Sequence, residues 1–347
     1  MTKQPPLDLT VIIPNYNTRD LLRSCIESVY RYTDGITFEV ICVDGNSPDG
    51  SATMVAEEFR EVILVRNSSN ESYARSVNQG LRMARGRYAC FLDSDTLLIE
   101  NALAPLVRFM DEHPDIAVCG PKLLNPDGSV QHHIRSFTGV GIFLLQSLDW
   151  HKLFPKSKLM NRYYHTDFDY SKAQSVESIG TSVYMIRRST WERVGLLDER
   201  FRWAMPDLAY NYTLHQLRYK VYYTPCAAVV HFGGQTASQD VLRALREQCQ
   251  GLIDFSDAYD YFGKSRLTKT VVRFGVRARY FSKVLGYYFS SDKRVIKGPG
   301  APAKETATQI GHMKRPPSRE HLRKEMEQVR GTSFSQSGSD ADSVASQ

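Results

Sequence analysis

The stretch RYACFLDSDTLL, residues 87–98, places two aspartates directly after a run of apolar and aromatic residues. The run is typical of a buried strand. Positions i and i+2 of an extended chain point the same way, so the carboxylates of Asp93 and Asp95 can face one spot. Two like charges there repel each other unless a cation lies between them. The pair is therefore either a solvated turn or half of a cation site, and the neighbouring segments must decide.

Other apolar runs alternate with helical patterns on both sides of this stretch. The alternation predicts βαβ units in an α/β fold, with a mainly parallel, Rossmann-like sheet flanked by helices. The predicted strands are 7–14, 38–45, 62–67, 87–92, 182–188 and 220–232. The predicted helices follow Thr18 as N-cap, pass through Met54 to Phe59, and cover 74–84, 102–115, 190–201 and 208–217, with a hairpin at 125–128 and no assignment for 136–178.

Polar side chains stand where four of these strands end. Asn15-Tyr16-Asn17 follows the first strand, Asp44 the second and Asn70 the third, and Asp93/Asp95 follow the fourth. Ligands of such sheets bind outside the carboxyl ends of the strands. We therefore expect these residues to gather at one edge and form a site.

Composition narrows the class of protein. Six cysteines are scattered without a C-x-x-C pair, which predicts free thiols in a reducing compartment. The first ten residues hold no apolar signal region, and no apolar run of about 18 residues occurs. The expected location is cytoplasmic, with any membrane contact peripheral and on the cytosolic face. No G-x-G-x-x-G follows the first strand, and no Walker-type G-x-x-x-x-G-K-[ST] is present, which argues against dehydrogenases and P-loop enzymes.

The C-terminal part differs in composition. Residues 264–290 predict a basic amphipathic helix without an acid between 264 and 289. Its apolar face consists of Leu267, Val271, Phe274, Ala278, Phe281, Leu285 and Tyr288. This helix could cover the core, lie on an anionic membrane or, less favoured, bind nucleic acid. Residues 291–347 predict a disordered tail, which leaves 1–263 as the catalytic domain.

Seven segments in consistent order resemble the family-two glycosyltransferases, which have the GT-A fold, and within them the bacterial rhamnosyltransferase-like branch. They are VIIPNYN (11–17), VDGNSPDGS (43–51), NESYARSVNQGL (70–81), FLDSDT (91–96), GPKLLNPDGSVQ (120–131), GTSVYMIRRSTWERVGLLDERF (180–201) and VYYTPCAAVVHFGG (221–234). The resemblance implies an enzyme that moves a sugar from a nucleotide diphosphate to an acceptor hydroxyl, with inversion at the anomeric carbon.

The resemblance also implies a set of donor-binding residues. Asp44 matches the aspartate that hydrogen-bonds the pyrimidine ring, although it could equally cap a turn. An arginine suits a diphosphate, although Arg75 could also be an exposed helix residue. The expected nucleotide-sugar-binding residues are Pro14, Asn15, Tyr16, Asp44, Asn70, Arg75, Asp93 and Ser94.

Asp93 and Asp95 resemble the D-x-D motif of the family. By this resemblance Asp95 is the direct metal ligand, Asp93 lies nearer the ribose, and His231 before Gly-Gly supplies a second ligand. Mg²⁺ is usually held by one or two carboxylates and substrate phosphates, and Mn²⁺ suits a mixed oxygen and nitrogen shell. The expected cofactor is Mn²⁺ or Mg²⁺, and the metal would neutralise charge on the leaving diphosphate.

The stretch 204–211 departs from the family pattern. Most relatives carry an acidic cluster here, whereas this chain has Pro206-Asp207-Leu208-Ala209. Asp207 is the remaining candidate for the general base, with His215 and Asp198 as poorer substitutes. Loss of the neighbouring acids keeps an alternative open, a catalytically weak homologue that binds nucleotide sugar and a partner protein.

The expected partners follow from the branch that the chain resembles. The donor is dTDP-L-rhamnose, with a UDP-hexose as the other candidate, because VDGNSPDGS is closer to the rhamnosyl pattern than V-D-D-G-S. The expected acceptor is a saccharide or lipid-linked saccharide in cell-surface polysaccharide biosynthesis. Nucleic acid is not expected as a partner.

Overall fold

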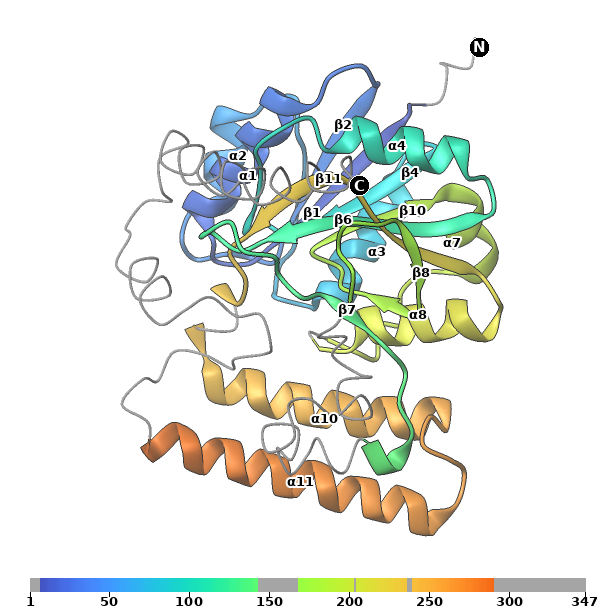
Figure 1. Cartoon of the computed structure of the whole chain (residues 1–347). Coiled ribbons are helices and arrows are strands. Elements are labelled where there is room, and N and C mark those ends of the chain that lie inside the picture. Colours follow the sequence, from blue (N-terminus) through green and yellow to red (C-terminus); the bar gives the residue numbers. More distant parts are fainter. Residues whose placement is uncertain (1–6, 143–167, 203, 236–238, 290–347) are drawn as a thin grey trace, which may run out of the picture.

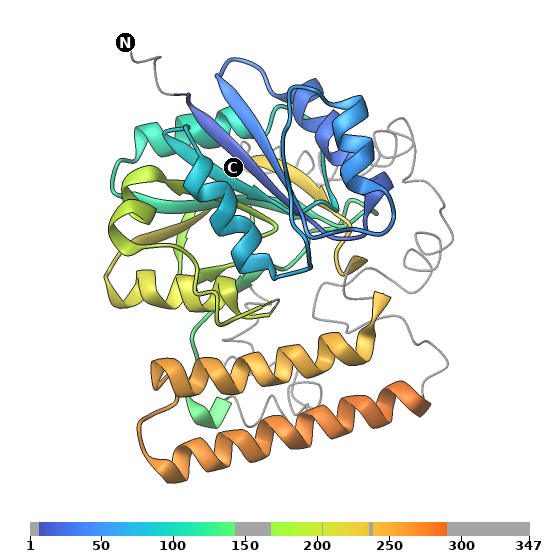
Figure 2. The ribbon, with the colours of Figure 1, turned by 180° about the vertical axis from the view of Figure 1, so that it is seen from behind.

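The computed structural model of the chain describes residues 7–142, 168–202, 204–235 and 239–289. A central sheet is covered by helices on both faces, and two long helices lie below it (Figure 1, Figure 2). The strands are β1 Leu9–Asn15, β2 Phe38–Asp44, β3 Ile63–Arg66, β4 Tyr88–Leu92, β5 Thr96–Leu98, β6 Ile116–Leu124, β7 Ile134–Arg135, β8 Gln174–Val176, β9 Ser178–Ile179, β10 Val183–Arg187 and β11 Lys220–His231. The helices are α1 Arg19–Tyr32, α2 Ser51–Glu58, α3 Tyr73–Met83, α4 Leu103–Glu112, α7 Arg188–Val194, α8 Pro206–Gln216, α10 Val241–Tyr259 and α11 Arg266–Phe289.

The sheet has the order β3-β2-β1-β4-β10-β6-β11-β5, with β8 beside β11. The first four strands are parallel, as the alternation of strands and helices predicts. β10 runs against both β4 and β6, and β11 is parallel to β6 but antiparallel to β5, so the second half is mixed. Because β10 runs against β4 and β6 runs against β10, β6 and β11 point in the same direction as β4. The carboxyl ends of β1, β2, β4, β6 and β11 therefore meet at one edge.

Alternating side chains divide the core between the two faces of the sheet. In β1, Val11 and Ile13 pack towards α1, α2 and α4, whereas Ile12 packs towards α3 and α8. Four cysteines are buried in the core and all six are free, as their scattered positions predict. The predicted helix at 190–201 is shorter than expected and covers 188–194, and the unassigned 136–178 contains β8.

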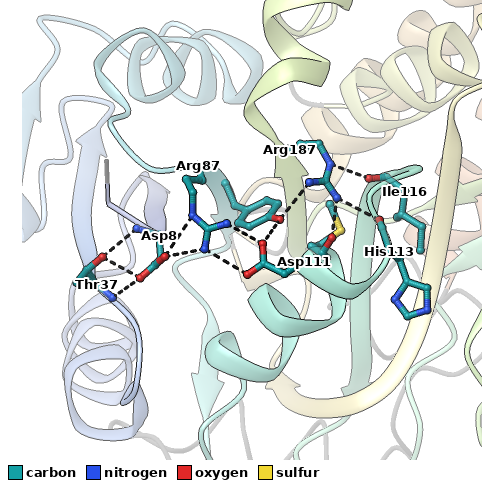
Figure 3. A network of polar contacts seen from close by, with 9 residues as sticks. Asp8, Thr37, Arg87, Asp111, His113, Ile116 and Arg187 are labelled. Carbon is teal, nitrogen blue, oxygen red and sulfur yellow. Dashed lines mark hydrogen bonds and ion pairs between the residues drawn. The ribbon is translucent and has the colours of Figure 1, made fainter. Parts of the chain in front are cut away.

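A network of charged side chains ties the elements at the opposite edge of the sheet (Figure 3). Arg87 contacts Asp8 at 2.7 Å and Asp111 of α4 at 2.6 Å. The hydrogen bonds from Arg87 help to lower the pKa of both carboxyl groups. Arg187 of β10 donates to the main-chain oxygens of Met110 and Ile116. The network therefore stabilises the edge that lies away from the candidate site.

The turn before β4 has no room for a side chain. A Cβ on Gly86 would lie 2.5 Å from the main-chain nitrogen of Thr10 and 2.5 Å from the oxygen of Tyr88. Main-chain atoms inside a sheet cannot move aside, so Gly86→Ala should lower the free energy of unfolding by about 3 kcal/mol. Urea denaturation measures this loss. The control is Gly139→Ala, where no atom lies within 4 Å of the added Cβ; equal stability of the two variants would contradict the packing.

α11 packs on α10 with a different face from the one that its sequence pattern suggests. Val272 and Val276 are buried against α10, at 1% exposure each. The predicted apolar face points away, with Phe274 76% and Phe281 69% exposed. The interpretation that this face covers the core is therefore wrong. Among the described residues no helix is both long and apolar enough to cross a membrane. The predicted tail, 291–347, lies outside the described residues.

Candidate functional site

Asn15, Asp44 and Ser47 form a polar cluster at the ends of β1 and β2, called here the predicted nucleotide cluster. Asp44 is 1% exposed and accepts hydrogen bonds from Asn15 Nδ2 at 2.8 Å, Ser47 Oγ at 2.6 Å and the main-chain nitrogen of Ser47 at 2.9 Å. The bonds from Ser47 form the turn that the capping interpretation of Asp44 expects. These bonds occupy part of the hydrogen-bonding capacity of the Asp44 carboxylate, so the role of Asp44 in donor binding stays a prediction.

Two other expected nucleotide-sugar-binding residues, Tyr16 and Asn70, lie beside Gly45. A Cβ on Gly45 would lie 3.4 Å from Asn70 Oδ1 and 3.5 Å from Cδ2 of the Tyr16 ring. Pro14 lies inside β1, opposite Val43 of β2. The structure thus places Tyr16 and Asn70 together beside a residue that has no side chain. A flat ring could approach the backbone at such a position.

Arg75 lies on α3 in a different setting. Its guanidinium is half exposed and contacts Glu71 at 3.4 Å and Glu199 at 3.3 Å. These ion pairs fit the interpretation of an exposed helix residue. Binding of a diphosphate by Arg75 would compete with both glutamates, so that role stays a prediction.

Asp93, Asp95 and His231 lie together where β4 and β11 end. One ligand atom from each falls within 4.8 Å of the other two. His231 Nε2 is 3.3 Å from Asp95 Oδ1 and 3.8 Å from Asp93 Oδ2. The pairing of β11 with β5 brings them together, since His231 lies opposite Thr96 and Phe232 donates to the oxygen of Asp95 at 2.9 Å. Two oxygens and one nitrogen form a donor set that fits Mn²⁺.

Burial and charge act together on these three groups. Burial and the neighbouring Asp95 raise the pKa of Asp93. Burial also opposes ionisation of Asp95, but His231 outweighs it and lowers the pKa of that carboxyl. Burial disfavours the charged ring of His231, yet the two aspartates raise its pKa overall. The site therefore favours a cation beside the paired carboxylates.

Sequence reasoning missed two hydroxyl groups that line the pair. Ser182 and Tyr73 both hydrogen-bond the Asp93 carboxyl group, and these bonds partly offset the rise of its pKa that burial and Asp95 cause. Ser182 Oγ also lies 3.4 Å from His231 Nε2. Burial raises the pKa of Tyr73 well above its usual value, and both Asp93 and Asp207 add to that rise. Tyr73 is thus close enough to both Asp93 and Asp207 for their charges to act on its hydroxyl.

Ser94 links the Asp93–Asp95–His231 group to the predicted nucleotide cluster through Thr18. The hydroxyls of Ser94 and Thr18 are 2.8 Å apart, and Thr18 Oγ1 donates to Asn15 Oδ1 at 2.7 Å. Thr18 is the N-cap residue of α1, as predicted, but its side chain makes no capping bond. Its hydroxyl is directed into the site instead.

Asp207 stands in the first turn of α8. Its Oδ1 accepts a hydrogen bond from the nitrogen of Leu208 at 2.8 Å. Burial raises its pKa, which makes the carboxylate a stronger base. Met205, the N-cap residue of α8, has a φ of 78°, a strained conformation for a residue with a side chain. Such strain at the start of α8 is typical of a functional segment.

The positions where relatives carry further acids are apolar and enclosed in this chain. Pro206 and Ala209 are buried, and Ala209 packs against Phe255 of α10. The alternative bases are engaged elsewhere. Asp198 pairs with Arg200 and accepts from the Tyr259 hydroxyl at 3.0 Å, and His215 packs on the ring of Phe137. Asp207 therefore stays the best candidate for the base.

Comparison with known proteins identifies a family that the chain matches. The model of the family described as Glycosyl transferase family 2 matches residues 10–189. The O-antigen biosynthesis protein RfbC of Myxococcus xanthus is 23% identical over 236 residues, which cover 67% of this chain and 18% of that protein. The poly(ribitol-phosphate) beta-N-acetylglucosaminyltransferase TarP of Staphylococcus aureus is 35% identical over 118 residues, 32% of this chain and 36% of that protein. The chain thus matches less than half the length of these relatives.

A solved structure illustrates the fold that the chain shares. The crystal structure of GalNAc-T7 with UDP, GalNAc and Mn²⁺ aligns with a TM-score of 0.50 and 17% identity, over 86% of this chain and 59% of that one. This likeness supports the predicted GT-A arrangement of a sheet between helices.

Proposed function

Since the chain belongs to glycosyl transferase family 2, we propose that it is an inverting, metal-assisted glycosyltransferase of cell-surface polysaccharide biosynthesis. The observation that carries this proposal is the convergence of the nucleotide cluster, the Asp93–Asp95–His231 group and Asp207 around one edge of the sheet. The class of acceptor is supported by two relatives, one named for O-antigen biosynthesis and one named as a poly(ribitol-phosphate) beta-N-acetylglucosaminyltransferase.

The proposed reaction is one displacement at the anomeric carbon. The acceptor oxygen forms the new glycosidic bond while the bond from that carbon to the diphosphate oxygen breaks. Asp207 takes the proton of the acceptor hydroxyl, and its raised pKa suits this task. The nucleoside diphosphate leaves with the electron pair, on the side of Asp93 and Asp95.

Two of the three clustered side chains would hold the metal. Asp95 and His231 would be direct ligands, and Asp93 would lie nearer the ribose. When bound, Mn²⁺ or Mg²⁺ would neutralise the charge of the leaving diphosphate. Ser182 and Tyr73 orient Asp93 through their hydroxyls.

The proposed donor is dTDP-L-rhamnose, and its test is slow transfer to water, which needs no acceptor. Release of nucleoside diphosphate is measured by chromatography over a panel of dTDP- and UDP-sugars with Mn²⁺. The expected result is metal-dependent release that is fastest from dTDP-rhamnose. Release only from a UDP-hexose would change the proposed donor but leave the proposed reaction unchanged. Donor binding without any release or transfer would contradict the proposal and favour a nucleotide-sugar-binding homologue.

We also propose that α11 touches an anionic membrane, where a lipid-linked acceptor would reach the enzyme. The apolar stripe of α11 is at least 60% exposed at each of these residues: Leu267, Phe274, Phe281, Leu285 and Tyr288. Arg266 and Arg277 follow one edge of the stripe at helical spacing, whereas Arg273 on the same edge is paired with Asp257 of α10 at 2.8 Å. Apolar side chains would enter the lipid boundary while the arginines contact headgroups. A second copy fits less well, because α11 has no acid to face these arginines.

Cosedimentation with vesicles tests this contact. Each phenylalanine of the stripe gains roughly 1.5 kcal/mol or more when it leaves water, so Phe274→Ser with Phe281→Ser should weaken binding to anionic vesicles at least about tenfold. Leu217→Ser, at a residue that is 55% exposed away from α11, is the control and should bind as the wild type does. Equal binding by both variants, or after deletion of 264–290, would contradict the proposal.

A further inference from the structure

The turn after β6 reaches the metal-binding end of the site. The nitrogen of Gly128 donates to the oxygen of Asn125 at 2.9 Å, and Gln131 then donates from its nitrogen to Leu123 at 2.8 Å. The chain is thus folded back along β6. The returning segment places the side chain of Gln131 beside His231, 100 residues further along the chain.

The contacts of Gln131 determine which end of its amide faces the histidine. One end lies 3.2 Å from the main-chain oxygen of His231 and 3.0 Å from Asn125 Oδ1. A main-chain oxygen can only accept, so the group facing it is the amide nitrogen. The other end, Oε1, is 2.6 Å from His231 Nδ1. Because an amide oxygen can only accept, Nδ1 must carry a proton.

The same reasoning orients Asn125. Ser129 Oγ donates to the carboxylate of Asp127 at 2.6 Å, because a carboxylate can only accept. Ser129 therefore accepts from Asn125 Nδ2, 2.9 Å away, and Asn125 Oδ1 faces Gln131. Four hydrogen bonds thus run in one direction, from His231 through Gln131, Asn125 and Ser129 to Asp127.

We propose that Gln131 is a positioning residue that holds His231 in the tautomer with its proton on Nδ1. The lone pair of Nε2 is then free to bind a cation together with Asp95, whose Oδ1 lies 3.3 Å from it, and Asp93, whose Oδ2 lies 3.8 Å from it. This inference rests on the proposed metal site. Histidine ligands commonly donate their second ring N–H to a partner that fixes the ring and its tautomer. The segment Asn125–Gln131 would supply that partner here.

Nitrogen NMR of the metal-free protein tests the tautomer directly. In protein labelled with ¹⁵N-histidine at alkaline pH, where the ring is neutral, we expect the proton of His231 on Nδ1, because Gln131 Oε1 lies 2.6 Å from Nδ1 whereas the competing acceptor, Asp95 Oδ1, lies 3.3 Å from Nε2. Gln131→Met keeps the length of the side chain but removes the acceptor, so the proton should move partly or fully to Nε2. Gln131→Glu retains an oxygen beside Nδ1 and should keep the proton there, at a cost in stability because its second oxygen faces the main-chain oxygen of His231. A proton on Nε2 in the wild type, or an unchanged pattern in Gln131→Met, would overturn the inference.

Metal affinity provides the second readout. With a nucleoside diphosphate present, Gln131→Met should bind Mn²⁺ about 10–100-fold more weakly by electron paramagnetic resonance. The control Gln250→Met removes an amide whose hydrogen bond stays within α10, to Asp254 at 2.8 Å, and should leave Mn²⁺ binding and His231 unchanged. Wild-type affinity in Gln131→Met would overturn the positioning role. If the wild type itself binds no Mn²⁺, the proposed metal site fails, and the NMR result alone decides the role of Gln131.

Discussion

Replacement of Asp207 by asparagine should lower the rate of sugar transfer about 10²–10⁴-fold, the usual contribution of a general base. Asparagine has nearly the same shape and can still accept from Leu208, so the start of α8 should keep its conformation. Donor affinity should stay close to that of the wild type, because the nucleotide cluster lies on β1 and β2. The measurement is the rate of nucleoside diphosphate release at saturating donor.

The pH dependence of the rate identifies the base. Burial raises the pKa of Asp207, so its carboxylate is protonated and inactive at pH values where an ordinary aspartate is still ionised. The wild-type rate should therefore fall as the pH falls through this raised pKa. The residual rate of Asp207→Asn should lack that limb. Asp198→Asn is the control, since its carboxylate pairs with Arg200, and a larger loss there than at Asp207 would contradict the assignment.

Replacement of Asp95 by asparagine should abolish metal-dependent donor binding. A bound metal contributes several kcal/mol to the stabilisation of a leaving diphosphate, so the transfer rate should also fall at least about 10²-fold. The fold should survive in the metal-free protein, because loss of the contact with His231 is offset by relief of the repulsion between Asp95 and Asp93. Calorimetric titration of the donor with Mn²⁺ measures the effect.

Two comparisons make the result for Asp95 specific. The melting temperature of metal-free Asp95→Asn should lie near that of the wild type, which separates lost binding from lost structure. Asp20→Asn, at an exposed position in the first turn of α1, should bind donor normally. Donor binding by Asp95→Asn that still responds to Mn²⁺ would reject the metal site.

The sequence predicts the parallel half of the sheet and the polar edge well, for a local reason. Each of β1, β2 and β4 is an apolar run that a polar residue ends, and the rule for strand ends then places Asn15, Asp44 and Asp93 together. Nothing in such runs shows that β10 reverses direction. That reversal and the pairing of β11 with β5 bring Ser182 and His231 to the aspartates.

Contacts between distant segments account for what the sequence does not show. Tyr73 reads as an ordinary first-turn helix residue, and Gln131 as the end of a turn motif, until the fold places them beside Asp93 and His231. In α11 the pattern finds the apolar stripe correctly. Periodicity cannot tell which face meets a neighbour, and here two valines on the other face are enough to pack α11 on α10.

The central claim is that this site binds a sugar nucleotide through a metal ion. Its most direct test is thermal unfolding of the wild-type protein with dTDP- and UDP-sugars, each with Mn²⁺, with Mg²⁺ and with EDTA. A ligand that binds only the native state raises the melting temperature by mass action. We predict stabilisation by at least one sugar nucleotide that is present with metal and lost with EDTA. Stabilisation that EDTA leaves unchanged, or none across the panel in a well-folded protein, would contradict the account.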